Sequence, residues 1–316
     1  MKKHKICKIL LVILAIFLCV AFYELLGICV AYKKQPEVSN TTKKETKNES
    51  WNECSENTER AVIIEKNPEA LLQRVRLIKN AKKEIILSTF AFQSDESGKL
   101  ILGALHDAAD RGVHIRLLVD GMESWIDMEG NPYFYGLSSH ENVEIKLYNK
   151  ANPLKPWKMM GRMHDKYLIA DGKRYILGGR NTYNYFLGDF PGHKNYDRDV
   201  LVVCDEPEKE NSVNQLLEYF ETIWEQEDSG YFHDNKKLAN RKSVKNAVLE
   251  LQNGYQKYFE ENKERICDTD YTDETFETEK IALVSNPIHT GSKEPVVWYQ
   301  LGELMKNAKN RVKIHT

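Results

Sequence analysis

The sequence predicts an α/β fold in which a mixed sheet is flanked by helices on both faces and preceded by one transmembrane helix. Three observations lead to this prediction. Between residues 61 and 227, short apolar runs typical of buried strands alternate with segments whose apolar residues recur at helical spacing. Glycine and proline separate many of these segments. An unbroken block of mostly apolar residues lies ahead of them, near the N-terminus.

The N-terminal apolar run extends from Ile9 to Tyr32 and follows four lysines. Its 24 residues exceed the roughly 20 that cross a bilayer. A cleaved signal peptide is the alternative, but a small-residue cleavage site is not evident. The residues before Cys29 weakly resemble a lipoprotein box, but Ile28 is bulky where a small residue is expected. We therefore expect residues 1–32 to form an uncleaved signal anchor. The modest excess of lysine before the span places the bulk of the chain on the extracytoplasmic side.

Composition limits the classes of protein to which the chain can belong. The 316 residues are 41% hydrophobic and 29% charged, with a net charge of −2, which suits a globular chain and not a disordered one. This near-neutral charge gives no general argument for nucleic-acid binding. The six cysteines show neither a disulfide framework nor the spacing of a zinc site. A carboxylate cluster for a metal is not evident either, and we expect no metal and no cofactor.

The predicted elements follow one another in a regular order. A polar segment, 33–60, reads as a flexible linker between the anchor and the domain. We then expect strands at 61–64, 84–92, 113–120 and 143–148, and helices from 68 to about 82, at 98–112 and at 131–139. A further strand at about 197–203 and an amphipathic helix at 211–226 complete a domain over 61–227. The charged segment 228–280 is expected to be a helical connection between domains.

Residues 161–181 combine side chains that suit a phosphoryl group. His164 and Lys166 lie two residues apart and therefore point the same way if the following apolar run is a strand. A turn at Asp171 would return the chain along a second strand to Gly179, where backbone can approach a ligand closely, and to Asn181. An imidazole, an ammonium and an amide would thus converge on one anion. The alternative is a hairpin with a histidine and a lysine on a solvated face.

The spacing H-x-K-x4-D followed by G-G-x-N resembles the signature of the phospholipase D superfamily. The R-M-H start and the G-G-R-N end look most like the bacterial cardiolipin synthase branch. The resemblance implies a phospholipase D-like fold and catalytic roles for His164, Lys166 and Asp171, the last in structure or orientation. It also implies phosphate binding by Lys166, Gly179 and Asn181. An acidic residue downstream often supports the histidine in this superfamily, which makes Asp197 and Asp199 candidates.

A second, incomplete repeat is expected over 281–316. Residues 77–89 and 304–316 are identical at six of thirteen positions. The segment 281–287, which precedes the second stretch, resembles 61–68, which precedes the first. A second signature at the same spacing would fall beyond Thr316. We therefore expect the first half of a two-signature protein, ending early as a truncated product or a fragment. The alternative is a single-signature protein that pairs two copies.

The resemblance and the anchor together suggest a membrane-bound phosphatidyltransferase or phosphodiesterase acting through a phosphohistidine. The expected substrate is an anionic phospholipid similar to phosphatidylglycerol, at a single-pass position in the cell membrane. The expected partner is a second signature-bearing half, from a longer chain or a homodimer. Nucleic acid is an unlikely partner. The alternatives are a phosphodiesterase or nuclease of the same fold, and an inactive half-enzyme that acts as a membrane-anchored binding protein.

Overall fold

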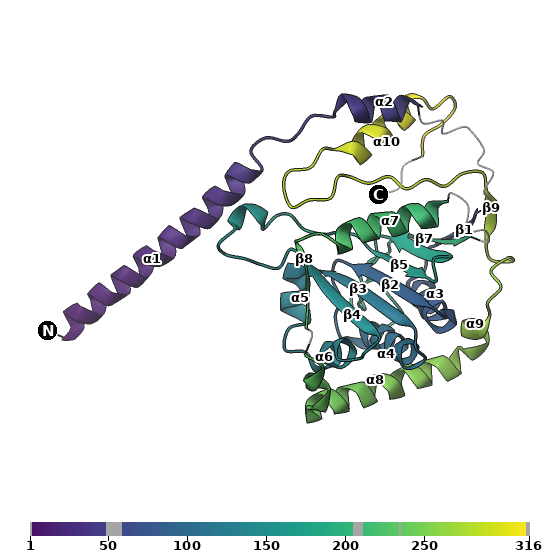
Figure 1. The fold of residues 1–316 in the computed structure, drawn as a ribbon, viewed down its shortest axis with the longest axis horizontal. Helices are drawn as coiled ribbons and strands as arrows, with labels where there is room; N and C mark the ends of the chain where they lie inside the picture. The colour runs from purple at the N-terminus through teal and green to yellow at the C-terminus, as the bar shows by residue number, and fades with distance from the viewer. Residues whose placement is uncertain (1, 49–58, 205–210, 234, 314–316) are drawn as a thin grey trace. The chain divides into compact units, whose positions relative to one another are not determined.

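The computed structural model describes residues 2–48, 59–204, 211–233 and 235–313. Its contacts divide the chain into two compact units, which we treat separately (Figure 1). The anchor unit comprises Met1–Ser50, Ala151–Arg162 and Val284–Thr316. The sheet unit comprises Trp51–Lys150 and Met163–Leu283, so it contains the expected domain 61–227 except for residues 151–162, which belong to the anchor unit.

Among the described residues of the sheet unit, nine strands form one mixed sheet with the order β8-β4-β3-β2-β5-β6-β7-β1-β9. Strands β2, β3 and β4 are parallel, and the other pairs are antiparallel. The bounds are β1 Glu59–Ile64, β2 Glu84–Thr89, β3 His114–Asp120, β4 Val143–Tyr148, β5 Tyr167–Ala170, β6 Arg174–Gly178, β7 Asp199–Cys204, β8 Ser229–Tyr231 and β9 Phe276–Thr278. The predicted mixed sheet is confirmed.

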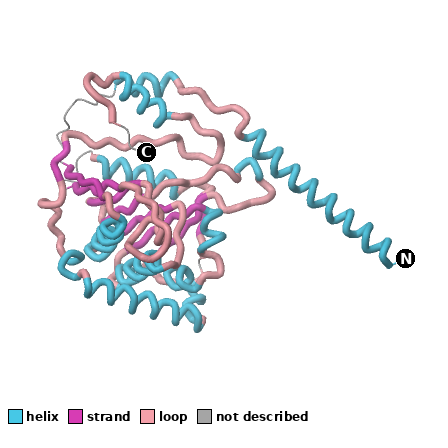
Figure 2. The backbone as a smooth tube through the Cα atoms, turned by 180° about the vertical axis from the view of Figure 1, so that it is seen from behind, coloured by secondary structure: helices cyan, strands magenta, loops and turns pink. Residues whose placement is uncertain are grey.

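Helices cover both faces of this sheet, as Figure 2 shows from behind. One face carries α7 (Ser212–Trp224), and the other carries α3, α4 and α6, which are among six further helices in the described part of the unit. These are α3 Asn67–Asn80, α4 Glu96–Asp110, α5 Gly121–Asp127, α6 Pro132–Ser138, α8 Lys242–Glu261 and α9 Lys263–Cys267, with the short 3-10 turn η2 Lys236–Asn240. Strand alternation explains the division: Leu117 joins the large core, while the Arg116 guanidinium lies 4.8 Å from the Phe220 ring of α7.

The segment 228–280, expected to be a connection between domains, belongs to the sheet unit instead. It supplies two edge strands, β8 and β9, and the helix α8, which packs on α4 and α6. The high charge hid apolar residues that recur at helical spacing on α8 and are buried, namely Val244, Leu251, Tyr255 and Phe259. The prediction of a connection between domains was wrong because one apolar face is enough to pack a helix on the core, even when its exposed face is highly charged.

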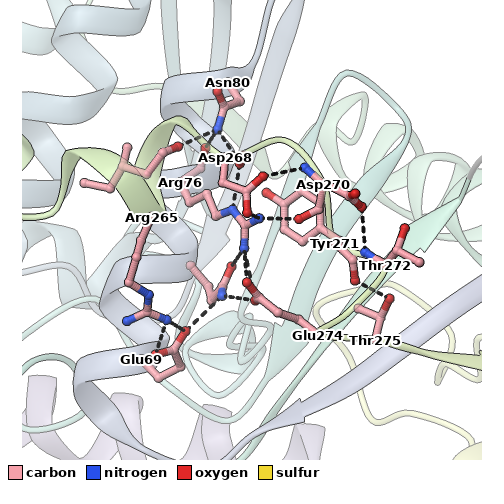
Figure 3. A network of polar contacts seen from close by, with 12 residues as sticks. Glu69, Arg76, Asn80, Arg265, Asp268, Asp270, Tyr271, Thr272, Glu274 and Thr275 are labelled. Carbon is pink, nitrogen blue, oxygen red and sulfur yellow. Dashed lines mark hydrogen bonds and ion pairs between the residues drawn. The ribbon is translucent and has the colours of Figure 1, made fainter.

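A buried arginine also ties this segment to the fold (Figure 3). The Arg76 side chain of α3 is 2% exposed and pairs with Glu274 at 2.9 Å. It also donates to the carbonyl oxygens of Asp268 and Asp270, at 2.8 and 2.6 Å, and lies 3.9 Å from the Tyr271 ring centroid. A charge this buried needs all of these acceptors, so the partners fix the path of residues 268–274.

The anchor unit contains α1 (Lys2–Ala31), α2 (Asn40–Asn48), the 3-10 turn η1 (Pro156–Lys158) and α10 (Val296–Lys306). The stretch Lys5–Ala31 of α1 is long and apolar enough to cross a membrane. The expected linker 33–60 is partly helical, because α2 lies within it, and Thr42 of this helix donates to Glu294 at 2.7 Å. Residues 49–58 of that linker lie outside the described residues.

The expected second repeat shows only its helix. Residues 304–306 end α10, as the comparison with 77–89 predicted. Residues 281–287 and 309–313 are not in strands in the described structure, and 314–316 lie outside it. A strand needs a neighbouring strand to accept and donate its backbone hydrogen bonds, and the described residues provide no such neighbour for these segments. The duplication itself stays a prediction.

Candidate active site

The signature hairpin forms as the sequence suggested, although its first strand begins later. Strand β5 starts at Tyr167, so His164 and Lys166 lie in the extended segment that leads into it. The backbone takes positive φ at Asp171 (55°) and Gly172 (62°), and β5 and β6 then pair antiparallel. Residues with short polar side chains or none tolerate this conformation, which fixes the turn at this point.

His164 and Lys166 meet at one aromatic ring, that of Phe90. The exposed His164 imidazole packs edge-on against Phe90 with ring centroids 4.6 Å apart. The Lys166 ammonium lies 5.2 Å from the same centroid and donates to the His164 carbonyl oxygen at 2.6 Å. Asp165, the residue between them, accepts instead from Tyr219 of α7 at 2.7 Å. The alternation expected of an extended chain therefore places the two catalytic candidates on the same side.

Asn181 reaches the same place from the end of β6. It is 7% exposed, and its Oδ1 atom accepts from the backbone N–H of Ala91 at 3.2 Å. This bond commits the oxygen to the protein, so the Nδ2 donors remain to meet an anion. Phe90 and Ala91 are consecutive and follow β2, so this turn is the common contact of His164, Lys166 and Asn181. The imidazole and the ammonium therefore contact the Phe90 ring, and the amide contacts the backbone of the next residue.

Burial lowers the pKa of the Lys166 ammonium to about 8, and the nearby carboxylates of Asp165, Asp197 and Asp120 oppose this shift. The side chain is 6% exposed, so the charged form has lost much of its hydration. A bound phosphodiester anion would add a further negative charge beside the ammonium. The site is thus electrostatically prepared for an anion, because that anion restores what burial removed.

The glycine pair at 178–179 leaves room for two carboxylates. A Cβ atom on Gly179 would lie 2.0 Å from Oδ2 of Asp197, and one on Gly178 would lie 2.0 Å from Oδ1 of Asp199. Either contact is far inside van der Waals range, so a side chain at 178 or 179 would displace the carboxylate. Glycine is therefore required here for close packing and not for a turn.

The two downstream aspartates occupy different environments. Asp199 is buried between the guanidinium groups of Arg74 and Arg180, at 2.9 and 3.2 Å, and all three side chains are at most 4% exposed. Asp197 is partly exposed, lies against Gly179 and contributes to the electrostatics of Lys166. The structure therefore brings Asp197 to the site and commits Asp199 to the ion cluster behind it.

Asp171 is not brought to the site. It lies at the other end of β5 from Lys166, where its carboxylate accepts from the backbone N–H groups of three successive residues, Lys82, Lys83 and Glu84, at 2.9, 2.7 and 3.0 Å. These bonds hold the turn of the hairpin to the start of β2. The geometry fits the structural role that the resemblance implied.

Two residues at the site were not found from the sequence. Phe90 directly follows β2 and Asp120 is the last residue of β3, so both lie at the carboxyl ends of parallel strands, where ligands commonly bind in α/β folds. Asp120 is 1% exposed, and its Oδ2 atom accepts from the backbone N–H of Met163 at 3.1 Å. It thereby fixes the residue before His164. Their position at strand ends was the available signal. Within the described ranges, clusters of three metal-ligating side chains are absent.

Comparison with known proteins places this site in a family. The model of the cardiolipin synthase, PLD-like domain matches residues 74–224. The chain is 30% identical over 212 residues to an uncharacterised protein of Helicobacter pylori J99, a match covering 62% of this chain and 39% of the relative. It is 29% identical over 171 residues to cardiolipin synthase C of Escherichia coli K12, covering 50% of this chain and 34% of the relative.

A solved structure, NucT of Helicobacter pylori, superposes with a TM-score of 0.43 and 17% identity, covering 55% of this chain and 99% of that one. The chain spans well under half the length of the two curated relatives. The matched range 74–224 contains the signature and both downstream aspartates. The family match and the cardiolipin synthase relative support a member of the phospholipase D superfamily.

Proposed function

We propose that this chain is a membrane-anchored phosphatidyltransferase or phosphodiesterase, similar to the cardiolipin synthases, that acts through a phosphohistidine at His164. The observation that carries the proposal is the convergence of His164, Lys166 and Asn181 on the Phe90–Ala91 turn. The match to the cardiolipin synthase domain supports a phospholipid substrate. The apolar helix α1 supports a single-pass position in the membrane, with the sheet unit on the extracytoplasmic side.

The first half-reaction would begin with attack of a neutral His164 nitrogen on the phosphodiester phosphorus. The N–P bond forms as the P–O bond to the leaving alcohol breaks. Lys166 and the Asn181 amide would hold the non-bridging oxygens as charge develops. Asp197, beside Gly179, would support the charged groups of the site. The leaving oxygen must also take a proton from an acid.

That acid would be the histidine of a second signature-bearing half, from a longer chain or a second copy. In the second half-reaction it would take the proton of an acceptor hydroxyl as that oxygen attacks phosphorus and the N–P bond breaks. With water as the acceptor, the outcome is hydrolysis. With the glycerol hydroxyl of a second phosphatidylglycerol, the outcome is cardiolipin and free glycerol.

The test is turnover by the purified chain in vesicles that contain phosphatidylglycerol labelled in its headgroup glycerol. We expect release of labelled glycerol together with cardiolipin, and loss of both in His164→Ala, because the nucleophile is gone. His289→Ala, a substitution of an exposed histidine, is the matched control and should keep the activity. A donor labelled at phosphorus should also leave acid-labile label on the wild-type protein and none on His164→Ala.

Parallel incubation with single-stranded DNA separates the alternatives. Strand cleavage without lipid turnover would contradict the lipid proposal and favour a nuclease of the same fold. Turnover of neither substrate, together with lipid binding, would identify a binding protein that lacks its second half.

A further inference from the structure

We infer that residues 151–162, called here the 151–162 loop, form a membrane-docking surface that inserts into the headgroup region of an anionic bilayer beside α1. The inference rests on the proposed anchoring by α1. It adds a second contact with the membrane, made by the segment that leads directly into the signature. A single residue, Met163, separates this loop from His164.

The loop belongs to the anchor unit and packs on the last turns of α1. The Tyr23 hydroxyl donates to the carbonyl oxygen of Leu154 at 3.1 Å. Pro156, which is buried, lies so close to the helix that a Cβ atom on Gly27 would be 2.5 Å from its ring. Glycine at 27 thus permits the contact, and the contact fixes the loop at one level along α1.

That level is the edge of the bilayer. Counted from Ile9, which follows the last N-terminal lysine, the roughly 20 residues that cross the hydrocarbon end near Ile28. At 1.5 Å per residue, the contacts at Tyr23 and Gly27 lie within about 8 Å of this edge. Glu24 lies between them, and a carboxylate is least costly where the helix leaves the hydrocarbon. Interfacial segments insert to a similar depth, about 5–10 Å.

The outer surface of the loop has the composition of such a segment. Leu154, Trp157 and Met160 are 77%, 45% and 59% exposed, although each is apolar or amphipathic. Trp157 is of the type enriched at membrane interfaces. Lys155 is exposed among them and carries the charge that anionic headgroups attract. Buried Pro156 holds the loop to α1 while its neighbours face outward, so the surface is presented and not packed away.

Docking here would hold residues 151–162, which lead into the signature, at headgroup level, where the phosphodiester of a phospholipid lies. The bilayer is the occupant that the loop fits, because the helix that supports it is the one expected to be in the membrane.

Tryptophan quenching by brominated lipid tests the inference on the full chain. The helix α1 contains no tryptophan, so the quenched emission comes from elsewhere in the chain. The protein is placed in phosphatidylglycerol vesicles whose acyl chains are brominated near the carbonyl, and wild type is compared with Trp157→Phe. We expect the Trp157 difference signal to fall by roughly half or more, because a ring inserted about 5–10 Å meets these bromines. Trp125→Phe, at a 69% exposed position on α5, is the matched control and should leave the quenched signal unchanged.

Two companion measurements distinguish the outcomes. Lys155→Glu should weaken the quenching in phosphatidylglycerol vesicles more than in phosphatidylcholine vesicles, since only the former attract the lysine. Flotation with the vesicles reports α1 insertion independently of the loop and of any turnover. Flotation with unchanged quenching in Trp157→Phe would overturn the inference alone. A chain that does not float would overturn both the anchoring and the docking surface, whereas loss of turnover alone bears only on the proposed reaction.

Discussion

The Lys166 ammonium is 6% exposed and has a backbone carbonyl oxygen, that of His164, within 2.6 Å. Burial lowers its pKa to about 8, from an ordinary value near 10.4. The folded protein therefore binds fewer protons than the unfolded chain between about pH 8 and 10.4, so stability rises with pH across that range. At pH 7 the charged form is present and costs stability. A bound phosphodiester anion would offset this loss of stability, because it would stabilise the buried ammonium.

Lys166→Met should accordingly stabilise the chain while removing its function. We expect a gain of about 1–3 kcal/mol in the free energy of unfolding at pH 7, since a buried charge becomes an apolar side chain of similar length. The rise in stability between pH 8 and 10.4 should disappear with the lysine. Thermal and denaturant unfolding in detergent at pH 7 and pH 9.5 measure both effects. Lys237→Met, at an exposed position, is the control and should shift stability by less than about 0.5 kcal/mol. A destabilised Lys166→Met with an unchanged pH slope would contradict the assignment.

At the scale of elements, the β5–β6 hairpin extends from the candidate site to the start of β2. Its open end carries the signature histidine and lysine, and its turn is bound to the start of β2 through Asp171. The signature therefore spans the full length of β5, with chemistry at one end and attachment at the other. Both ends contact β2 or the turn after it, which places Phe90 in register with the hairpin.

Asp171→Ala tests this division of roles. We expect a loss of about 1–3 kcal/mol in the free energy of unfolding, because three backbone donors lose a charged acceptor and alanine tolerates a φ of 55° poorly. Asp171→Asn should lose less, since asparagine accepts hydrogen bonds and adopts positive φ readily. In protein that remains folded, the rate of glycerol release should stay near wild type. A stable Asp171→Ala protein with abolished turnover would instead place the carboxylate in the reaction.

At the scale of the whole molecule, the chain is two compact units, and the sheet unit includes a late segment that returns to its edges. Strand β9 pairs with β1, β8 pairs with β4, and α8 covers α4 and α6. The core is thus closed by residues that follow the matched family domain, which ends at residue 224. A protein cut at the end of that match would expose the apolar surface of α4 and α6.

Arg76→Met should loosen this late segment. Removing the guanidinium takes a donor from Glu274, which keeps that of Gln73, and from two carbonyl oxygens, and we expect a cost of about 2–4 kcal/mol. Limited proteolysis should then cut within 262–278 before the rest of the sheet unit, and mass spectrometry of the fragments locates the cut. Arg265→Met is the matched control: its side chain is 55% exposed and pairs with Glu69, so the cost should stay below about 1 kcal/mol. Equal protease sensitivity in the two variants would show that Arg76 does not hold the segment.

The sequence by itself determined the order of strands and helices from 61 to 227, the apolar N-terminal helix and the spacing of the signature. These depend on local periodicity and on residue type, which a single chain displays directly. The helix α5 and the late start of β5 were missed. A helix of seven residues, and the few residues that lead into a strand, are too short to show a clear hydrophobic periodicity.

Only the tertiary structure decided which distant residues meet. It separated Asp197 from Asp199, brought Phe90 to the site, placed Asp171 at the far end of the hairpin and joined 228–280 to the sheet. Two aspartates two residues apart look alike in a sequence, and the difference arises because Arg74 of α3 and Arg180, which follows β6, both pair with Asp199. The proposed role of the 151–162 loop likewise depends on tertiary structure, because it rests on the contact of this loop with a helix more than 120 residues earlier in the chain.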